Sequence, residues 1–342
     1  MAIYYSTFIT GLKDVIQQYL KEYNILTILD GAIIYETNKT LEEINKHRFF
    51  QNTFLVLEYF KYNKNNININ DIFETTNINN CQSLILEYLN THKKIKTFKI
   101  FSSLENQFIS VDRKVLGHFE NKIEAITKLK VELNRKKPDL ELWFLIRSEK
   151  IALFLLRLTN KKQDTQKGEL KQELSNILCL LSNMKETDII LDPFCGSGSI
   201  MLERSRIQNF TGIFACDNNI DNISSLKNKI KKINNKKLNK SFFVKYLDFF
   251  NNTFDNEFFT TIITDPPWGI YTQIDNIEDF YYKMLLEMIR ILKHKGTIII
   301  LSANKEIMNN CINKLNTKIH LLDTYNILVS GKKAGIFKIE KI

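Results

Sequence analysis

The chain has 342 residues, a formal net charge of +10 and 44% hydrophobic residues. This length is enough for two domains, and the hydrophobic fraction excludes a disordered chain. No apolar run of about 20 residues is present, which excludes a membrane-spanning helix, and no signal-like start is seen, so we expect a cytoplasmic location. The basic balance favours a polyanionic partner. The five cysteines are scattered without a C-x-x-C pair, so we expect reduced thiols and no metal site.

The front half predicts an α+β module. Its expected elements are, in chain order, a strand over 3–10, a helix over 13–23, a helix over 116–133 and a hairpin over 140–159. The Asn-rich stretch 63–80 is predicted as a loop or a weak element. Residues 160–167, rich in Lys, Gln and Asp, are the best linker. We therefore expect two domains, 1–160 and 167–342.

The second half alternates strand and helix signals. Apolar runs open at Ile189, Gly212, Phe242, Thr261 and Thr297. A helix is expected over 278–292, and a terminal antiparallel hairpin over 320–329 and 334–339. The alternation predicts an α/β, doubly wound and mainly parallel sheet with an antiparallel edge.

A Gly-rich loop follows the first of these strands. The run Asp192-Pro193-Phe194-Cys195-Gly196-Ser197-Gly198-Ser199 leads into a helix-compatible segment. Gly196 and Gly198 permit positive φ and let backbone N–H groups approach a ligand. Asp192 can reach the edge of that ligand, and Phe194 can pack beside it. An ordinary tight β–α turn is the alternative, because the third glycine of the dinucleotide fingerprint is missing.

Two acidic turns support a nucleotide-like ligand. Asp217-Asn218 ends the next strand, 25 positions after Asp192, where a ribose would present two hydroxyls to a carboxylate. Asp248 could accept a hydrogen bond from an adenine amino group, with Phe249 against the ring. A solvated turn carboxylate is an equally good interpretation of Asp248.

A second special loop, Thr264-Asp265-Pro266-Pro267-Trp268-Gly269, follows the strand 261–263. The Asp265 carboxylate and the Pro266 carbonyl can accept both hydrogens of an exocyclic base amine, which makes its nitrogen more nucleophilic. Pro266-Pro267 stiffens the loop, and Trp268 offers a face for base stacking worth about 1–3 kcal/mol. A Pro-rich turn that closes a strand is the alternative.

Together the two loops predict methyl transfer from S-adenosylmethionine to a nucleic-acid nitrogen. The base must be single-stranded, looped or flipped to reach such a pocket. Neither a metal nor a covalent nucleophile is required, because a sulfonium is already activated and the protein contributes mainly orientation and electrostatics.

The chain resembles the class I S-adenosylmethionine-dependent methyltransferases that carry an Asn/Asp-Pro-Pro-aromatic loop. More narrowly it resembles the RNA methylases with a THUMP domain, most of which are tRNA guanine-N2 methyltransferases. Their pattern D-P-F-x-G-[ST]-G-[ST] is matched throughout 192–199. Residues 167–170 look like the start of the family's helix that covers the cofactor. Trp268 replaces the commoner Tyr or Phe, which leaves the choice of base open.

The resemblance implies a Rossmann-like catalytic domain behind a ferredoxin-like and THUMP-like module, with S-adenosyl-L-methionine as cofactor. The front resemblance lies in residues 4–12 and in the hairpin 138–159. The implied partner is RNA, in particular tRNA, and some related enzymes also use a small activator subunit. The implied cofactor-binding residues are Asp192, Pro193, Phe194, Gly196, Ser197, Gly198, Asp217, Asn218, Asp248 and Phe249. The implied catalytic residues are Asp265, Pro266, Pro267 and Trp268.

Three other functions stay open. A DNA adenine-N6 or cytosine-N4 methyltransferase would use the same loop, but a target-recognition region would be expected in place of the THUMP-like module. An enzyme that methylates a protein glutamine amide is disfavoured by the basic charge. A non-catalytic RNA-binding scaffold is disfavoured by the intact loops.

Overall fold

The structure is a computed structural model that describes residues 1–62, 68–105, 107–133, 137–159, 169–233, 241–269, 274–329 and 331–342. The chain divides into two compact units. The front unit comprises Met1–Thr7 and Gln17–Lys162, and the back unit comprises Phe8–Ile16 and Gln163–Ile342. The predicted linker, 160–167, lies outside the described residues, and the domain limits 1–160 and 167–342 stay a prediction.

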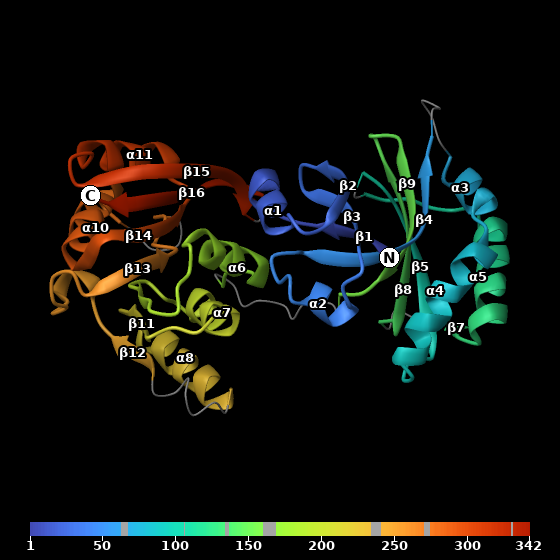
Figure 1. Cartoon of the computed structure of the whole chain (residues 1–342), viewed down its shortest axis with the longest axis horizontal. Helices are drawn as coiled ribbons and strands as arrows, with labels where there is room; N and C mark the ends of the chain where they lie inside the picture. The colour runs from blue at the N-terminus through green and yellow to red at the C-terminus, as the bar shows by residue number, and fades with distance from the viewer. Residues whose placement is uncertain are drawn as a thin grey trace. The chain divides into compact units, whose positions relative to one another are not determined.

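The front unit is built on one mixed sheet with strand order β2-β3-β1-β4-β9-β8-β5-β6, and β7 also pairs with β5. Its strands are β1 (Ala2–Thr7), β2 (Asn24–Leu29), β3 (Ala32–Thr37), β4 (Asn52–Lys61), β5 (Thr97–Leu104), β6 (Gln107–Phe108), β7 (Lys130–Val131), β8 (Leu140–Arg147) and β9 (Ile151–Arg157). Its helices are α2 (Leu41–Asn45), α3 (Ile69–Thr75), α4 (Ile78–Thr91) and α5 (Arg113–Thr127), while α1 (Lys13–Tyr19) spans the boundary between the two residue groups. Figure 1 shows α3, α4 and α5 along one face of this sheet.

The hairpin predicted over 140–159 is confirmed as the antiparallel pair β8–β9. The loop prediction for the Asn-rich stretch was wrong over the residues that are described, since α3 and the start of α4 lie there. Its asparagines act as helix caps: Asn68 accepts from the backbone N–H of Asn70, and Asn77 accepts from that of Asn79. The intervening Ile72 is buried, with other apolar side chains of α3. The polar composition of this stretch therefore did not reveal that two helices begin in it.

The two helices that the sequence predicted in the front half, over 13–23 and 116–133, are shorter in the structure. Helix α1 ends at Tyr19 instead of residue 23. Helix α5 begins after Asp112, whose side chain accepts from the N–H groups of Lys114 and Val115, and ends at Lys128 in the left-handed conformation. The last part of the predicted 116–133 helix is instead β7, which pairs in parallel with β5.

The back unit has the predicted doubly wound architecture. Its sheet order is β12-β11-β10-β13-β14-β16-β15, parallel from β12 to β14 and antiparallel at β16 and β15. The strands are β10 (Ile189–Asp192), β11 (Gly212–Asp217), β12 (Phe242–Tyr246), β13 (Phe259–Thr264), β14 (Leu292–Ser302), β15 (Ile319–Val329) and β16 (Lys332–Lys341). The helices are α6 (Gln172–Leu181), α7 (Ser199–Ile207), α8 (Ile220–Lys232), the 3₁₀ helix η1 (Phe249–Asn251), α10 (Ile277–Ile291) and α11 (Lys305–Lys314). The mainly parallel sheet and the terminal hairpin are thereby confirmed.

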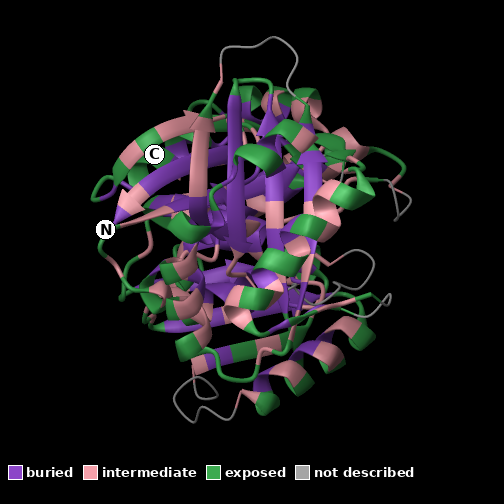
Figure 2. Cartoon of the chain, turned by 90° about the vertical axis from the view of Figure 1, so that its right-hand side faces the viewer, coloured by how far each residue is buried: buried purple, intermediate pink, exposed green. Residues whose placement is uncertain are grey.

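Strand β14 begins at Leu292, earlier than the predicted Thr297, because Leu292 already pairs with Phe259 before a bulge in the ladder. Helices α10 and α11 bury methionine and isoleucine side chains in a core shared with β13, β14 and β16. In Figure 1, helices α6, α7 and α8 lie away from α10 and α11, and Figure 2 shows that burial is concentrated in the strands. Within the described part of the chain, no helix combines the length and apolar character needed to cross a bilayer.

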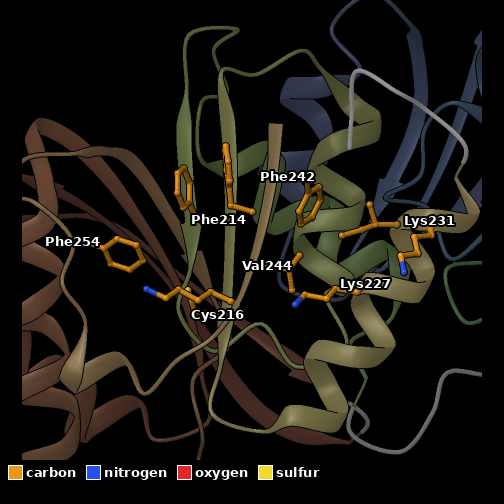
Figure 3. Close-up of a pocket in the computed structure, with 10 residues that line it drawn as sticks. Phe214, Cys216, Lys227, Lys231, Phe242, Val244 and Phe254 are labelled. Carbon is orange, nitrogen blue, oxygen red and sulfur yellow. The ribbon is translucent and has the colours of Figure 1, made fainter. Parts of the chain in front are cut away.

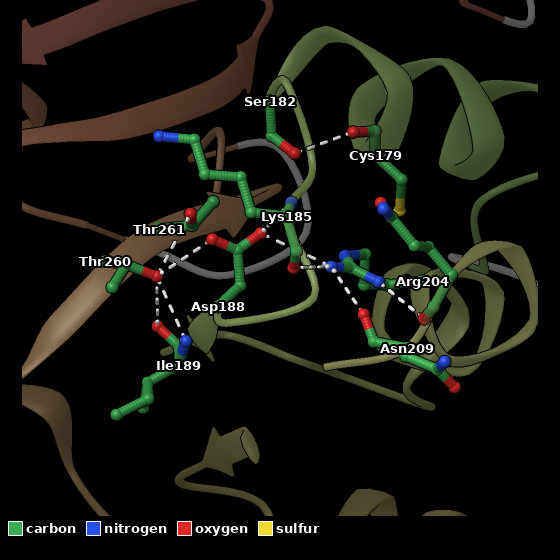
Figure 4. A network of polar contacts seen from close by, with 10 residues as sticks. Cys179, Ser182, Lys185, Asp188, Ile189, Arg204, Asn209, Thr260 and Thr261 are labelled. Atoms are coloured by element: carbon green, nitrogen blue, oxygen red, sulfur yellow. Dashed lines mark hydrogen bonds and ion pairs between the residues drawn. The ribbon is translucent and has the colours of Figure 1, made fainter. Parts of the chain in front are cut away.

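A buried ion pair fastens α7 to the start of the sheet (Figure 4). Arg204, 0% exposed, donates to Asp188 Oδ2 at 3.3 Å and to the carbonyls of Lys185 and Gln208. Asp188 Oδ1 in turn accepts from the hydroxyl of Thr260 on β13 at 3.2 Å. This network lies before β10, at the amino ends of the strands. It therefore fixes the edge of the sheet opposite to the two predicted loops.

Candidate cofactor and substrate site

The two predicted loops meet at the carboxyl edge of the back sheet. Strands β10 and β13 are parallel neighbours, with Ile190 opposite Thr261 and Leu191 opposite Ile262. The strand order reverses between them, and such a switch point is where ligands bind in open α/β sheets. The hydroxyl of Thr264 donates to Asp192 Oδ1 at 2.8 Å, so one hydrogen bond joins the end of β13 to the Gly-rich loop.

The two glycines of the first loop serve different purposes. Both have positive φ, +49° at Gly196 and +83° at Gly198. A Cβ at Gly198 would collide with the side chain of Leu226 on α8, so this glycine permits close packing of the loop against that helix. A Cβ at Gly196 would meet no atom within 4 Å. The loop is therefore packed against α8 on one side and open on the other. We call this loop, residues 192–199, the Gly-rich cradle.

Asp217 shapes this cradle. Its Oδ2 accepts from the backbone N–H of Gly196 at 2.8 Å, and its Oδ1 accepts from the N–H of Asn219 at 2.8 Å and the side chain of Asn222 at 3.2 Å. Asp217 is buried at the end of β11, whereas its neighbour Asn218 is exposed. The structure thus brings Asp217 to the Gly-rich loop and leaves Asn218 turned to solvent.

Asp248 and Phe249 follow the next strand, β12. Asp248 caps η1, with Oδ1 accepting from the N–H of Phe250 at 3.1 Å and Oδ2 from the Asn251 side chain at 2.7 Å. Phe249 is 1% exposed and meets Phe194 edge-on at 5.5 Å. Phe250, which sequence reasoning passed over, is 40% exposed and offers the more accessible ring.

Burial raises the pKa of two carboxyls of the site, those of Asp192 and Asp265. It raises the pKa of Asp192, 1% exposed, to about 7, although the hydrogen bond from Thr264 opposes the shift. It raises the pKa of Asp265 to about 8, against the hydrogen bond from Trp268 and with a further rise from the nearby Asp192.

These carboxyls suit a cationic ligand. Within the described residues, no ion pair is formed by Asp192, Asp217 or Asp265. Buried acidic groups without a cationic partner are costly, and a positively charged ligand would compensate them. S-adenosylmethionine carries a sulfonium and an ammonium group, so the open cradle and its acidic surround fit this cofactor.

The second loop presents two acceptors. The indole N–H of Trp268 donates to Asp265 Oδ1 at 2.8 Å. Among the described residues, none donates a hydrogen bond to Asp265 Oδ2 or to the carbonyl of Pro266. Asp265 is half-buried and Pro266 is buried. The carboxylate and the carbonyl named from the sequence thus both keep accepting capacity.

Several residues of the site escaped the sequence reasoning. Tyr281 donates to the carbonyl of Pro267 at 3.1 Å, and the Asn304 side chain donates to the carbonyl of Trp268 at 2.8 Å. Asn304 follows strand β14, much as Asp192 and Asp217 end β10 and β11, so its place after a strand was a signal that could have found it. Tyr281 lies in the apolar stripe of α10, where the pattern indicates only core.

Glu169 joins the Gly-rich loop to α8 through two hydrogen bonds, and the sequence predicted only part of this arrangement. Glu169 Oε1 accepts from the Ser197 hydroxyl at 2.6 Å and from Lys229 Nζ at 2.5 Å. Glu169 and Leu170 belong to the segment that resembles the start of the family's cofactor-covering helix, but they lie just before α6, which begins at Gln172. Lys167 and Gly168 lie outside the described residues.

A hollow of about 740 Å³ lies beside the edge strand β12 (Figure 3). Figure 3 shows Lys227 and Lys231 of α8 on one side of β12 and Phe254 on the other. Phe242 and Val244 also line it. It includes none of the residues of the two predicted loops, so it is not part of the candidate site.

Comparison with known families gives one match that covers much of the chain. The family model described as "UPF0020: RMKL-like, methyltransferase domain" matches residues 159–331, just over half of the 342 residues. The match includes both loops, from Asp192 to Trp268.

Two curated relatives are similar in sequence. A tRNA (guanine(10)-N2)-dimethyltransferase of Methanocaldococcus jannaschii is 28% identical over 173 residues, which cover 45% of this chain and 48% of the relative. A probable tRNA (guanine(10)-N2)-dimethyltransferase of Methanothermococcus thermolithotrophicus is 29% identical over 175 residues, covering 46% of this chain and 90% of the relative. The chain thus spans about half the length of the first relative.

The crystal structure of TrmN from Thermus thermophilus has the same fold. It superposes with a TM-score of 0.76 over 100% of both chains, at 16% sequence identity. At this identity the likeness concerns the fold alone. The fold class expected from the sequence, a Rossmann-like methyltransferase domain behind an α+β module, is confirmed.

Proposed function

Because the chain belongs to the UPF0020 (RMKL-like) methyltransferase family, we propose that it transfers a methyl group from S-adenosylmethionine to an exocyclic amine of an RNA base. The favoured target is guanine N2 in tRNA. One observation carries the proposal: the acceptor pair of Asp265 and Pro266 is joined to the Gly-rich cradle by the hydrogen bond from Thr264 to Asp192. This bond couples a place for a base amine to a place for the cofactor.

The cradle residues would hold the cofactor. Asp217 would accept from the ribose hydroxyls, the open side of Gly196 would admit the ligand, and Asp192 would face its positive charge. When bound, S-adenosylmethionine supplies a methyl group on a sulfonium sulfur. The site therefore needs no further activation of the donor, only orientation and charge complementarity.

The second loop would act on the base amine. Asp265 Oδ2 and the Pro266 carbonyl accept one N–H each, which holds the nitrogen's lone pair toward the cradle. As the N–C bond forms, the bond between the methyl carbon and the donor's sulfur would break, its electron pair going to the sulfur, and the nitrogen must lose one proton. Asp265, whose pKa burial raises to about 8, can accept it in its ionised form, which predominates above that pH. Trp268 would supply the stacking face for the base.

The choice of tRNA guanine is supported by the relatives. Both curated relatives are named for guanine-N2 methylation of tRNA, and the region that they share with this chain covers 45% and 46% of it. An exocyclic amine on guanine suits a site that offers two hydrogen-bond acceptors. The basic net charge of +10 is consistent with an RNA substrate.

We further propose that residues 1–160 form an RNA-binding, THUMP-like module and that 167–342 form the catalytic domain. The front unit carries an aromatic group in which the Trp143 ring stacks on that of Phe101, with ring centroids 4.8 Å apart, and is tilted against that of Phe108, with centroids 5.7 Å apart. Phe108 is 71% exposed, and exposed rings of this kind bind unpaired bases. A cytoplasmic location and a small activator subunit stay predictions.

Methyl incorporation tests the function. Labelled S-adenosylmethionine is incubated with undermodified tRNA and, in parallel, with genomic DNA, and the products are digested for nucleoside mass spectrometry. We expect N2-methylguanosine in the tRNA. The Asp265→Ala variant should lose transfer while calorimetry still detects cofactor binding. Label in DNA alone would contradict the RNA assignment, and a fully active Asp265→Ala variant would contradict the mechanism.

A further inference from the structure

We propose that Tyr281 and Asn304 are positioning residues of the Asp265–Trp268 loop, which bind two of its carbonyls and so keep the Pro266 carbonyl available for substrate. The proposal rests on the proposed function, since it assigns the Pro266 carbonyl to the base amine. Its geometry, however, concerns the protein alone and can be tested without RNA.

The carbonyls of three consecutive residues in this loop differ in their partners. The Tyr281 hydroxyl donates to the Pro267 carbonyl at 3.1 Å, and the Asn304 amide donates to the Trp268 carbonyl at 2.8 Å. Among the described residues, none donates to the preceding carbonyl, that of Pro266. The described part of the protein thus occupies two of the carbonyls and leaves the one beside Asp265 to another donor.

Within the loop, the hydrogen bond from Trp268 to Asp265 joins two side chains but holds none of the three carbonyls. Pro266 and Pro267 have no backbone N–H, so neither can donate a hydrogen bond that would hold the loop in place. Carbonyls are the backbone polar groups that these two prolines offer to the rest of the fold. Donors from α10 and from the end of β14 therefore determine how the loop is oriented.

The donors themselves are fixed by a directed chain of hydrogen bonds. The Tyr281 hydroxyl has one hydrogen, and donating it to Pro267 makes its oxygen the acceptor for the Asn304 amide at 3.2 Å and for the Ser302 hydroxyl at 3.1 Å. Ser302 Oγ in turn accepts from the backbone N–H of Asn304 at 3.1 Å.

This arrangement is internally complete. Each of the two side-chain N–H groups of Asn304 has an acceptor, the Trp268 carbonyl and the Tyr281 hydroxyl. Tyr281 and Ser302 are both 0% exposed, so water cannot replace these bonds. Removal of the Tyr281 hydroxyl would free the Pro267 carbonyl and leave Ser302 without an acceptor for its hydrogen.

The kinetic test is Tyr281→Phe, which removes the hydroxyl and keeps the ring. We expect kcat for tRNA methylation to fall about tenfold or more, the equivalent of one buried hydrogen bond, while the Kd of S-adenosylmethionine stays unchanged. Asn304→Ser should act in the same direction. Tyr282→Phe is the matched control, since Tyr282 is the next residue of α10 and lies outside this hydrogen-bond chain; its kcat should match that of the wild type.

A spectroscopic test needs no RNA. The chain has two tryptophans, so Trp143→Phe leaves Trp268 as the sole indole reporter. In this background we expect Tyr281→Phe to increase acrylamide quenching of Trp268 and to lower its anisotropy at a temperature where the variant is still fully folded, whereas Tyr282→Phe should change neither. Unaltered quenching and anisotropy would overturn the proposal, even if tRNA is methylated. An altered signal in a protein that methylates no RNA would uphold the positioning role and reject the proposed function.

Discussion

We expect Trp268 to combine two roles that a tyrosine or phenylalanine could not combine. Its ring is the expected stacking face for the base, and its indole N–H donates to Asp265 Oδ1 at 2.8 Å. The Tyr or Phe commoner at this position in related enzymes has no donor in the same place on its ring. The hydrogen bond lowers the pKa of Asp265 against the opposing effect of burial. The tryptophan therefore tunes the carboxyl that it lies beside.

We predict that Trp268→Phe moves the acidic limb of the pH–kcat profile to higher pH. Loss of the indole donor raises the pKa of Asp265 further, and the neighbouring Asp192, together with the hydroxyl of Tyr281, cannot compensate because neither brings positive charge. Activity at pH 7 should fall about tenfold, as expected for one hydrogen bond to a charged group, and should recover above about pH 9.

Trp143→Phe is the control for this change, because Trp143 lies in β8 of the front unit. Its profile should keep the wild-type acidic limb. A Trp268→Phe profile that is lowered equally at all pH values would show that the indole serves stacking alone.

At the scale of elements, the turn between β10 and α7 depends on a glycine for two separable reasons. Gly198 has a φ of +83°, which disfavours any side chain, and its missing Cβ also leaves room for Leu226 of α8. Gly331 has nearly the same φ, +82°, but a Cβ there would meet nothing within 4 Å. The two positions therefore separate backbone strain from packing.

We predict that Gly331→Ala lowers the free energy of unfolding by about 1 kcal/mol, the cost of a left-handed residue. Gly198→Ala should lower it by about 2–4 kcal/mol, because overpacking against Leu226 adds about 1–3 kcal/mol to the same strain. Urea denaturation measures both changes. In Leu226→Ala the added cost of Gly198→Ala should shrink toward that of Gly331→Ala; equal costs in both backgrounds would exclude the packing explanation.

This β–α unit was predictable from the sequence because its apolar run, its glycines and its helix follow one another without interruption. Tyr281 was not predictable in the same way, and the one local signal for Asn304 was its place after strand β14. They lie 14 and 36 positions along the chain from the carbonyls that they bind, and only the fold brings them together. An aromatic residue in an apolar helix stripe indicates core, and nothing local distinguishes Tyr281 from its neighbours.

At the scale of the whole molecule, the two buried carboxyls of the site make the free energy of unfolding depend on pH. Burial raises the pKa of Asp192 to about 7 and that of Asp265 to about 8, well above the ordinary value of about 3.9. The folded protein therefore binds more protons at these groups than the unfolded chain does. Their contribution to stability is complete below about pH 4 and is lost as the pH rises through about 7 and 8.

Two other groups, His47 and Cys216, limit the pH range in which the effect of the site carboxyls on stability can be measured. Burial lowers the pKa of His47 to about 4, so its titration makes the folded state more stable as pH rises up to the ordinary histidine value of about 6.5. Burial raises the pKa of Cys216 to about 12, which contributes stability that is lost only above the ordinary thiol value of about 8.5. Between about pH 7 and 8.5 the two site carboxyls should therefore dominate.

We predict that the free energy of unfolding of the back unit falls between about pH 7 and 8.5, by at most about 0.7 kcal/mol per pH unit for Asp192 and about 1.4 kcal/mol per pH unit for Asp265. Urea unfolding followed by Trp268 emission in the Trp143→Phe background measures this unit, since Trp143 reports on the front unit. The double variant Asp192→Asn/Asp265→Asn should be flat over the window. A wild type that is equally flat would mean that both carboxyls are already ionised in the folded protein, and the acidic site would then attract a cation without releasing protons.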